Sequence, residues 1–590
     1  MVPAAHRGGL GYLMRLASLL RRSPAEYRFR LRQECMNLLL LAIPPAPKLP
    51  APPSPLPGLG APPPLPENAD ALAERIHAHR FPVLMLEAEM GPEIRWRRDA
   101  SSGIETGTEF FRRIPYLDAA RAGDHKVIWE VNRHQHLVLL AQRGRPEDVD
   151  EIAAELTSWL AQNPWHRGIN WCSALEVAFR ALSWLWIWHL CGARLPEALR
   201  GPLLTSLYRH GVHLEYNLSV YFSPNTHLLG EAVALFALGQ LLPAWPRAER
   251  WRRLGSEWTL RQMETQVRED GSHFEQSSYY HVYALDFFRF YRDLGGETNP
   301  GFEAKLQRME SYLGALMGPA GRLFLIGDDD GGRFFHPYGD PSTYGRNVPG
   351  RKAPERSTVF KDAGMVIFRK GQRQVLFDAG PFGRGSAGHS HADTLQVLVR
   401  DGEEALLTDP GTYTYVADPA ARDLFRGTAM HNTLLLDGRD QADAHGPFRW
   451  NNVPRVHLKR FGEDGAEATC EMADGRKHTR QLRWQGDDLM LVLDAVEGTR
   501  TVERWWHPGV PVRHAGELRW QLGDAAWLLL DRPVEVVESW RSRGLGHREK
   551  WPSLVSRHQA DQPMSAAIYF GKTCPYRGVE RDGAEIRVLQ

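Results

Sequence analysis

Residues 364–378 have the sequence GMVIFRKGQRQVLFD, in which a polar turn containing glycine separates two apolar runs. Short apolar or alternating runs bounded by such turns are typical of β-strands. The pattern continues along the chain, and turns such as Asp401-Gly402, Asp437-Gly438 and Asp474-Gly475 divide the runs. Residues 346–590 are therefore predicted to form an antiparallel β-sandwich.

Upstream of this stretch the apolar residues recur with the period of an α-helix. Segments such as Ala174–Leu190, Thr226–Leu242 and Tyr280–Leu294 carry them at i, i+3 or i+4, and i+7. Loops rich in proline, glycine and asparagine separate the segments, which predicts consecutive helical hairpins over residues 67–345. A helical half followed by a strand half makes an α+β multidomain chain, with a cleft expected where the halves meet.

The first 66 residues make two further segments. Residues 1–43 are basic, and the stretch from Pro24 to Leu41 predicts an amphipathic helix that packs on the main body. Membrane contact by this helix is the less favoured alternative. Residues 44–66 contain twelve prolines, a composition typical of a stiff, extended linker.

Composition limits the classes of partner. The 590 residues include 72 Lys+Arg and 71 Asp+Glu, so the net charge of +1 provides no overall field for nucleic acid. The five cysteines are scattered and form no CxxC, which argues against a disulfide scaffold and a thiolate zinc site. The apolar run Met36–Ile43 is short and late for a signal peptide. A cytoplasmic location is the default expectation, and a periplasmic one is the alternative.

The segment 223–231 opens a predicted helix with several polar side chains. Asn225 or Thr226 before an apolar run is the usual start signal of a helix. Capping accounts for one polar residue, but not for His227 and Glu231, which lie one turn apart on one helix face. Helix capping and a functional site are equally open here.

Almost every residue from Asp270 to His281 can form hydrogen bonds, yet the apolar helix Val282–Tyr291 follows at once. One interpretation is a capped loop anchored by a tyrosine. The other places Tyr280 and His281 at a helix start facing a cleft, where a phenol can act as an acid or a base.

Residues 383–393, GRGSAGHSHAD, make a glycine-rich loop with two histidines and an aspartate. Small residues allow the backbone to approach a ligand closely. His389 and His391 share a face if the segment is extended. Packing seldom needs such a loop, so a functional interpretation is favoured.

Asp409 and His431 are weak signals alone, but with His391 they make a His/Asp/His set that suits Zn²⁺. Spacing alone leaves both a metal site and ordinary packing open. The acidic run 327–332, GDDDGG, lacks EF-hand spacing and predicts a solvated turn. No organic cofactor is expected.

The tryptophans divide into two groups. Trp184 and Trp188 lie one helical turn apart and are predicted to be core residues. Trp165 and Trp171 flank Asn170 in a loop, where a sugar ring could stack on an indole.

Together these segments resemble the heparinase II/III-like polysaccharide lyases, which include heparin and heparan sulfate lyases and relatives acting on alginate. The resemblance runs from about residue 70 to 560 and rests on ordered motifs at 271–281, 389–393, 409–413 and 429–433. It implies an incomplete (α/α) toroid followed by an antiparallel β-sandwich, in agreement with the change of period. It also implies β-elimination at a 4-linked hexuronate of an acidic polysaccharide.

The resemblance assigns roles to individual residues. Tyr280 is implied as the base, the acid or both, and His389 as the second proton-transfer group. Asn225 and His227 are implied as the pair that neutralises the substrate carboxylate. Many relatives place an asparagine directly before this histidine, whereas Thr226 stands there in this chain. The resemblance implies a structural zinc held by the residues His391, Asp409 and His431. The expected substrate-binding residues are Trp165, Asn170, Trp171, Glu231, Glu275, His281, Arg384 and Arg426.

Two other functions remain open. A glycoside hydrolase on the same scaffold would use a carboxylate pair such as Glu231 and Glu275. A non-catalytic polysaccharide-binding protein in surface-polymer assembly is the other alternative. The motif loops contain few basic side chains, which favours an unsulfated uronate polymer as substrate. These basic residues are Arg167, Arg180, Arg384 and Arg426.

Overall fold

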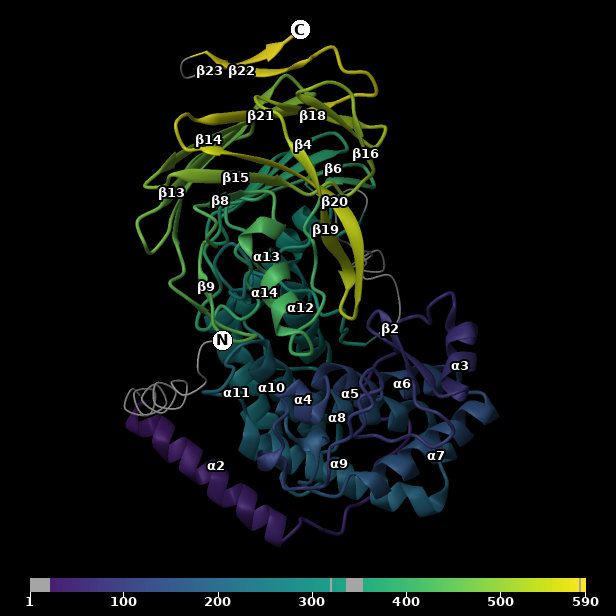
Figure 1. The fold of residues 1–590 in the computed structure, drawn as a ribbon. Coiled ribbons are helices and arrows are strands. Elements are labelled where there is room, and N and C mark those ends of the chain that lie inside the picture. The colour runs from purple at the N-terminus through teal and green to yellow at the C-terminus, as the bar shows by residue number, and fades with distance from the viewer. Residues whose placement is uncertain (1–21, 319–320, 336–353, 583–584) are drawn as a thin grey trace, which may run out of the picture.

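The computed structural model describes residues 22–318, 321–335, 354–582 and 585–590. Figure 1 shows a helical lobe below a lobe of sheets, with helices α12 (Ser278–Asp293) and α13 (Pro300–Met317) reaching up under the strands. Residues 1–21 of the predicted basic segment and the predicted boundary between residues 345 and 346 lie outside the described residues.

The helical lobe is an incomplete (α/α) toroid, as predicted. Its remaining helices are α2 (Pro24–Ala42), α3 (Ala69–His77), α4 (Ala119–Ala122), α5 (His125–Asn132), α6 (Gln135–Arg143), α7 (Pro146–Gln162), α8 (Ala174–Cys191), α9 (Glu197–Asn217), α10 (Thr226–Leu241) and α11 (Ala248–Gln266).

Helix α10 packs on α8, α9, α11 and α12. It is apolar around its whole circumference, as a helix must be when neighbours cover every side. Gly255 of α11 permits the close packing, because a Cβ at that position would lie 2.4 Å from the backbone nitrogen of Phe236. The start of α10 carries Asn225 and His227.

Three antiparallel sheets of four or more strands make up most of the described part of the strand lobe, as the alternating pattern predicted. The eight-stranded sheet has the order β11 (Arg455–Phe461), β12 (Gly465–Glu471), β13 (Lys477–Gln485), β14 (Leu489–Glu497), β21 (Met564–Phe570), β18 (Ala526–Leu530), β17 (Arg519–Leu522), β16 (Val512–His514). The four-stranded sheet has the order β19 (Glu535–Gly544), β20 (His547–Gln559), β15 (Thr501–Trp506), β8 (Leu434–Leu436). The five-stranded sheet runs in chain order through β3 (Thr358–Phe360), β4 (Met365–Lys370), β5 (Arg373–Asp378), β6 (Val397–Asp401) and β7 (Glu404–Leu407).

Smaller elements complete the structure. They are the hairpins β1 (Arg80–Val83)–β2 (Leu86–Glu89), β9 (Asp443–Ala444)–β10 (Trp450–Asn451) and β22 (Gly578–Asp582)–β23 (Glu585–Leu589), helix α14 (Pro419–Phe425), and 3₁₀ turns at Phe111–Arg113, Ile169–Trp171, Gly192–Arg194 and Thr428–Met430.

Strand β4 explains why residues 364–378 lack strict alternation of polar and apolar residues. Met365 and Ile367 belong to the core of the helical lobe, whereas Val366 and Phe368 belong to the core between the sheets. A sheet covered on both faces needs apolar residues at every position. The five-stranded sheet is therefore the layer that joins the two lobes.

The proline-rich stretch is docked on the toroid. The carbonyl oxygens of Pro45, Pro50 and Pro53 accept hydrogen bonds from Arg209, Trp245 and Trp188, at 2.9, 3.0 and 3.2 Å. The prediction of an extended segment agrees with this path, but the segment is not a free connector. It returns the chain to the lobe and places α2 along its edge (Figure 1).

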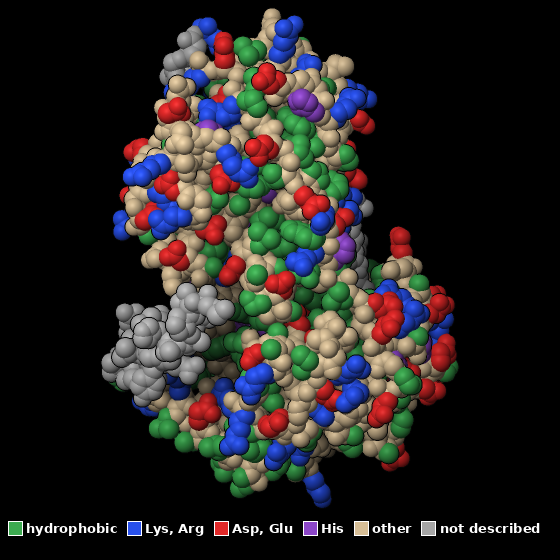
Figure 2. Space-filling model, viewed as in Figure 1, with side chains coloured by type: hydrophobic (Ala, Val, Ile, Leu, Met, Phe, Trp, Pro, Cys, Tyr) green, Lys and Arg blue, Asp and Glu red, His purple; other side chains and the backbone are tan. Residues whose placement is uncertain are grey.

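Helix α2 extends over Pro24–Ala42, and the sequence predicted a helix from Pro24 to Leu41. Asn37 and Asn217 of α9 exchange buried amide hydrogen bonds of 2.8 and 2.9 Å, which fix α2 on the toroid. Among the described helices, none is long and apolar enough to cross a membrane. All five cysteines are free. Figure 2 shows basic and acidic side chains mixed over the viewed face, in keeping with the balanced charge.

Candidate active site

A cavity of about 500 Å³ receives side chains from both lobes. The helical lobe contributes Asn225, His227 and Tyr280, and the strand lobe contributes His389. These four are the residues that the sequence singled out for catalysis, and they come from positions up to 164 residues apart (389 − 225). Because ligand sites prefer concave junctions between domains, the cavity is the candidate active site.

Tyr280 lies in the first turn of α12. Ser277 caps this helix, and its hydroxyl accepts a hydrogen bond from the backbone N–H of Tyr280 at 3.1 Å. The phenolic Oη of Tyr280 lies 3.3 Å from Oδ2 of Asp330 and 3.2 Å from the Oη of Tyr415. Burial and the nearby Asp330 carboxylate hold the pKa of Tyr280 well above its ordinary value. At neutral pH the side chain is therefore a neutral phenol, ready to donate its proton.

The ring of His389 stacks on the ring of Tyr280, with centroids 3.7 Å apart and planes inclined by 19°. Nδ1 of His389 lies 3.0 Å from Oδ2 of Asp328. Since a carboxylate only accepts hydrogen bonds, Nδ1 donates to Asp328, and a ring with a single proton keeps its lone pair on Nε2, which lies 3.6 Å from Oε2 of Glu275. The geometry makes Nε2 the nitrogen that can accept a proton.

Asp328 organises this region from the buried acidic run. Its carboxylate also contacts Nε2 of His391 at 3.0 Å and is bound in a bidentate manner by Arg422, with Nη2 to Oδ2 at 2.7 Å. Burial disfavours ionisation of Asp328, but Arg422 and the hydrogen bonds outweigh it, so the pKa of this carboxyl is well below its ordinary value. Gly327, at φ +64°, permits the approach, because a Cβ there would lie 2.5 Å from the carbonyl oxygen of His389.

The sequence predicted a solvated turn over residues 327–332, and this prediction is wrong. Asp328, Asp329 and Asp330 are 0%, 6% and 4% exposed. Arg422 neutralises the first of them, and Lys126 pairs with Asp330 at 2.8 Å. Buried carboxylates require such partners, and both cations are distant in the sequence.

The opposite wall of the cavity carries Asn225 and His227. Oδ1 of Asn225 caps α10 by accepting from the N–H of His227 at 3.1 Å, and its Nδ2 donates to Oε2 of Glu275 at 3.0 Å. Burial lowers the pKa of His227 to about 4, so the imidazole is neutral at neutral pH. Thr226 is fully buried and its N–H binds Glu275, so Asn225, not Thr226, faces the cavity.

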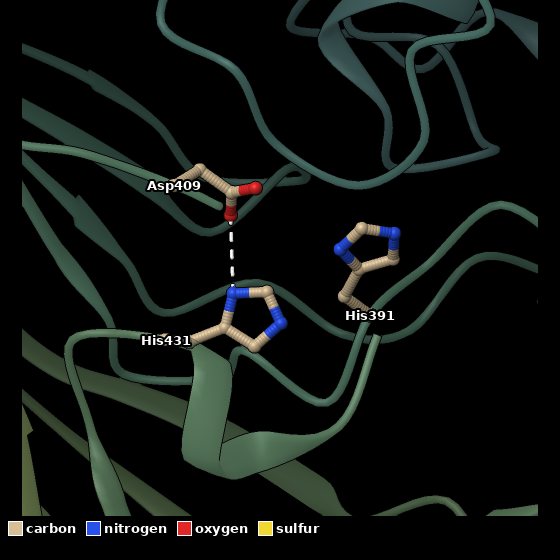
Figure 3. A group of neighbouring side chains, drawn as sticks. All are labelled: His391, Asp409 and His431. Atoms are coloured by element: carbon tan, nitrogen blue, oxygen red, sulfur yellow. Dashed lines mark hydrogen bonds and ion pairs between the residues drawn. The ribbon is translucent and has the colours of Figure 1, made fainter. Parts of the chain in front are cut away.

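His391, Asp409 and His431 meet in a buried group in which one ligand atom of each lies within 4.8 Å of the others. Figure 3 shows the two imidazoles and the carboxylate converging from separate segments, with Nδ1 of His431 bonded to Oδ2 of Asp409 at 3.1 Å. Within the described residues, Nδ1 of His391 and Nε2 of His431 are buried and lack hydrogen-bond partners. Two orphaned imidazole nitrogens beside a carboxylate fit a zinc ion, and the Asp328 carboxylate on Nε2 of His391 orients that ring, as carboxylates do for histidine ligands of zinc.

Comparison with known families places the chain. The model of the heparinase II/III N-terminus matches residues 68–309, and that of the heparinase II/III-like C-terminal region matches residues 352–573. Together they cover more than half of the chain. The chain belongs to the heparinase II/III-like family.

This heparinase II/III-like chain is 25% identical to a heparin-sulfate lyase of Bacteroides stercoris over 449 residues, which are 64% of this chain and 63% of that protein. It is 24% identical to a heparin-sulfate lyase of Pedobacter heparinus over 417 residues, 64% of this chain and 61% of that one. The chain thus spans about three fifths of the length of these relatives. A solved heparinase III structure superimposes with a TM-score of 0.67 at 15% identity, covering 96% of this chain and 98% of that one.

Three predicted sugar contacts of the heparinase II/III-like chain lie in its core. The indole N–H of Trp165 donates to the Leu40 carbonyl of α2 at 2.8 Å, and Trp171 is 1% exposed. Asn170 is fully buried and donates to the carbonyl of Trp96. The loop folds inward because α2 covers it, so these side chains cannot stack on a sugar in this structure.

None of the other five predicted binding residues lines the cavity, and four of them hold the scaffold instead. Both oxygens of Glu231 accept from Ser219, at 2.7 and 2.6 Å, and Glu275 anchors the start of α10. His281 is buried against the carbonyl of Met309. Arg426 bonds Asp423 and the carbonyl of Gly446, and Arg384 is exposed outside the cavity. The sequence selected polar residues near the starts of α10 and α12. Of these, Asn225, His227 and Tyr280 line the cavity, whereas Glu231, Glu275 and His281 do not.

Sequence reasoning missed most basic residues of the cavity. They come from segments without a motif and are Arg30, Arg112, Lys126, Arg133 and Arg449. Lys126 and Arg133 are balanced by buried carboxylates, whereas the more exposed Arg30 and Arg112 pair with Glu26 and Glu34, and Arg449 is exposed. No local pattern marks them, because only the fold brings them to one wall. Tyr415 was missed as well, although it follows the 409–413 motif directly.

Proposed function

We propose that this chain is a polysaccharide lyase that cleaves a 4-linked hexuronate polymer by β-elimination and leaves a 4,5-unsaturated uronide at the new end. The observation that supports the proposal is the Tyr280–His389 stack inside a cavity whose facing wall carries Asn225 and His227. A proton acceptor, a proton donor and neutral hydrogen-bond donors thus share one cavity.

The reaction needs three groups. A base removes the C5 proton, the electrons form the C4=C5 double bond, and the C4–O4 bond breaks as an acid protonates O4. Negative charge builds up on the C5 carboxylate during proton removal, and hydrogen-bond donors must stabilise it there.

His389 is the base in this proposal. Asp328 holds the proton on Nδ1 at 3.0 Å, which leaves the Nε2 lone pair available. The stacked Tyr280 ring fixes the imidazole plane from one side. His389 therefore takes the C5 proton, with Asp328 as a positioning residue.

Tyr280 is the acid in this proposal. Its raised pKa keeps the phenol protonated until the oxygen of the breaking bond becomes more basic than the phenolate. The neighbouring Asp330 is ionised, since Lys126 and Arg133 overcome the effect of burial and lower its pKa to about 2. A return of the proton from His389 to Tyr280 through solvent or substrate restores the resting state.

Asn225 and His227 receive the uronate carboxylate. One amide N–H of Asn225 is committed to Glu275, and the second is free to donate toward the cavity. The neutral His227 ring supplies a further N–H. Such donors stabilise charge that grows in the transition state without holding the ground state equally tightly.

Hydrolysis is less well supported than elimination. Glu231 and Glu275, the pair expected for a glycoside hydrolase, do not line the cavity. The carboxylates that do line it, Glu176 and Asp330, are paired with Arg133 and Lys126. Hydrolysis requires one carboxyl group to be protonated as the general acid, and these cations oppose protonation. A purely binding role would not require the Asp328–His389 pair.

A sulfated glycosaminoglycan is the first candidate substrate. The similar curated proteins are heparin-sulfate lyases. The expectation of an unsulfated polymer rested on the motif loops, and the cavity adds basic residues that those loops lack. Arg30, Arg112 and Arg449 line the cavity and are at least partly exposed, so they can contact an anionic chain.

The experiment is a panel of uronate polysaccharides, sulfated and unsulfated, followed by the ultraviolet absorbance of the 4,5-unsaturated uronide and by mass spectrometry of the products. We expect unsaturated ends from at least one sulfated member. Saturated products would show hydrolysis, and binding without turnover of any polymer would show a non-catalytic role. Either result would overturn the proposal.

A further inference from the structure

A second group of metal-ligating side chains lies in the helical lobe, outside the cavity. His79 stands directly before β1, and Glu151 and Glu155 lie one turn apart on α7. One ligand atom of each lies within 4.8 Å of the others. We propose that His79, Glu151 and Glu155 bind a zinc ion, separate from the His391–Asp409–His431 group.

The hydrogen bonds of His79 define its free nitrogen. Nδ1 lies 2.7 Å from the carbonyl oxygen of Gly91, which can only accept, so Nδ1 carries the proton. Nε2 then has a lone pair in the neutral ring, yet it lies 3.0 Å from Oε1 of Glu151, which is also an acceptor. Two acceptors at this distance need either a proton or a metal ion between them. A backbone carbonyl on the second nitrogen is the arrangement that orients histidine ligands of metals.

Glu155 supplies an independent observation. The residue is 2% exposed, and Oε2 lies 2.8 Å from Nε2 of His136. Within the part of the chain that the structure describes, Oε1 is buried and has no hydrogen-bond partner. Buried carboxylate oxygens are rarely left without a partner. A bound cation would satisfy Oε1, with His136 orienting the carboxylate from behind.

The donor set selects the type of ion. One imidazole nitrogen with two carboxylate oxygens suits zinc, whereas calcium and magnesium prefer oxygen ligands alone. Zinc ligands at about 2.0–2.1 Å in a tetrahedron lie about 3.3 Å from one another. The ligand atoms of this group lie within 4.8 Å of one another, so they have to approach by at most about 1.5 Å to hold the ion. The fourth position is left to water.

The site joins elements that also connect the lobes. His79 leads into the β1–β2 hairpin, and at its tip the N–H of Met85 donates to the Leu545 carbonyl of the β19–β20 hairpin at 3.2 Å. A metal that fixes His79 to α7 thus anchors the hairpin from the toroid side. Zinc is expected to stabilise the folded chain without reaching the reacting groups.

The test counts zinc in the full-length protein. The chain is stripped with a chelator, incubated with excess zinc and desalted, and bound zinc is measured by inductively coupled plasma mass spectrometry. The variants are His79→Asn, chosen because asparagine tolerates the φ of 50° at this position, and Glu151→Gln. The control is Asp150→Asn, which removes the same charge from the neighbouring exposed position of α7.

We expect both variants to bind one zinc fewer per chain than the wild type and Asp150→Asn. Zinc should raise the melting temperature of the two variants less than that of the control, because a ligand stabilises only a state that binds it. Circular dichroism verifies that each variant is folded. If His79→Asn does not fold, Glu151→Gln alone decides the test. Unchanged zinc content in a folded variant would overturn the proposal. So would the loss of all bound zinc in His431→Asn, because that would leave none for the second site. No readout depends on lyase activity.

Discussion

The ring of Tyr280 lies against the ring of His389, with centroids 3.7 Å apart, although one comes from the first turn of a toroid helix and the other from a loop of the sandwich. This contact holds the proposed acid and base in one place. It also makes catalysis depend on the junction of the lobes, because neither lobe carries both groups.

Removing the phenol of Tyr280 should abolish most of the activity. Tyr280→Phe keeps the stack on His389 but removes the proton of the proposed acid, so we expect kcat to fall by about 10²–10⁴-fold. The measurement is the initial rate of unsaturated-product formation. Tyr569→Phe, on strand β21 outside the cavity, is the matched control. Full activity in Tyr280→Phe would falsify the assignment.

Asp328→Asn should lower kcat far more than it changes KM. The amide can donate as well as accept, so Nδ1 of His389 is no longer forced to carry the proton. We expect a loss of about 10²-fold or more in kcat. A neutral ring with its proton on Nε2 has no lone pair at that nitrogen to accept the C5 proton. Loss of the charge next to Arg422 also destabilises the fold. Folding is monitored by circular dichroism, and a KM effect alone would contradict a positioning role.

Helix α2 should contribute to binding of the polymer. Arg30 lines the cavity, whereas Arg28 of the same helix is exposed outside it. Arg30→Ala is expected to raise KM by about two- to fivefold with kcat unchanged, since an exposed ion pair is worth up to about 1 kcal/mol. Arg28→Ala is the control. Equal KM values for both variants at low and high salt would argue against a role for this helix.

Glu231 should make stability depend on pH. Burial raises the pKa of its carboxyl from 4.5 to about 8 in the folded chain. The folded state therefore binds a proton that the unfolded state releases, so stability is full below about pH 4.5 and falls as pH rises toward 8. The loss is of the order of several kcal/mol. The free energy of unfolding in urea should differ less between pH 5 and pH 9 for Glu231→Gln than for the wild type. An identical difference in both proteins would show that Glu231 does not titrate this way.

Zinc should stabilise the sandwich through His391, Asp409 and His431. Chelation is expected to lower the melting temperature, and restored zinc should raise it again. His431→Asn should lose one zinc per chain and most of this response, because it removes a buried ligand. His445→Asn, an exposed histidine, is the control. A zinc content unaffected by His431→Asn would show that these residues hold no metal.

Local periodicity predicted the two lobes. Helical segments such as α7 and strands such as β15 follow from burial at every third or fourth, or every second, residue, and each pattern is visible within a dozen residues. The motifs likewise located Tyr280 and His389, because a polar cluster before an apolar element is visible in the chain itself.

The tertiary structure alone decided which polar residues face the cavity. The acidic run 327–332 was predicted to be solvated, yet Arg422, 94 positions away from Asp328, makes its burial possible. Trp165 was predicted to face a sugar, yet α2 covers it from 125 positions away. These outcomes depend on pairing between distant segments, which no local period encodes. The sequence by itself determined the elements and the reactive residue types, whereas long-range packing and charge neutralisation determined the site, since a buried charge is stable only beside a partner that the fold supplies.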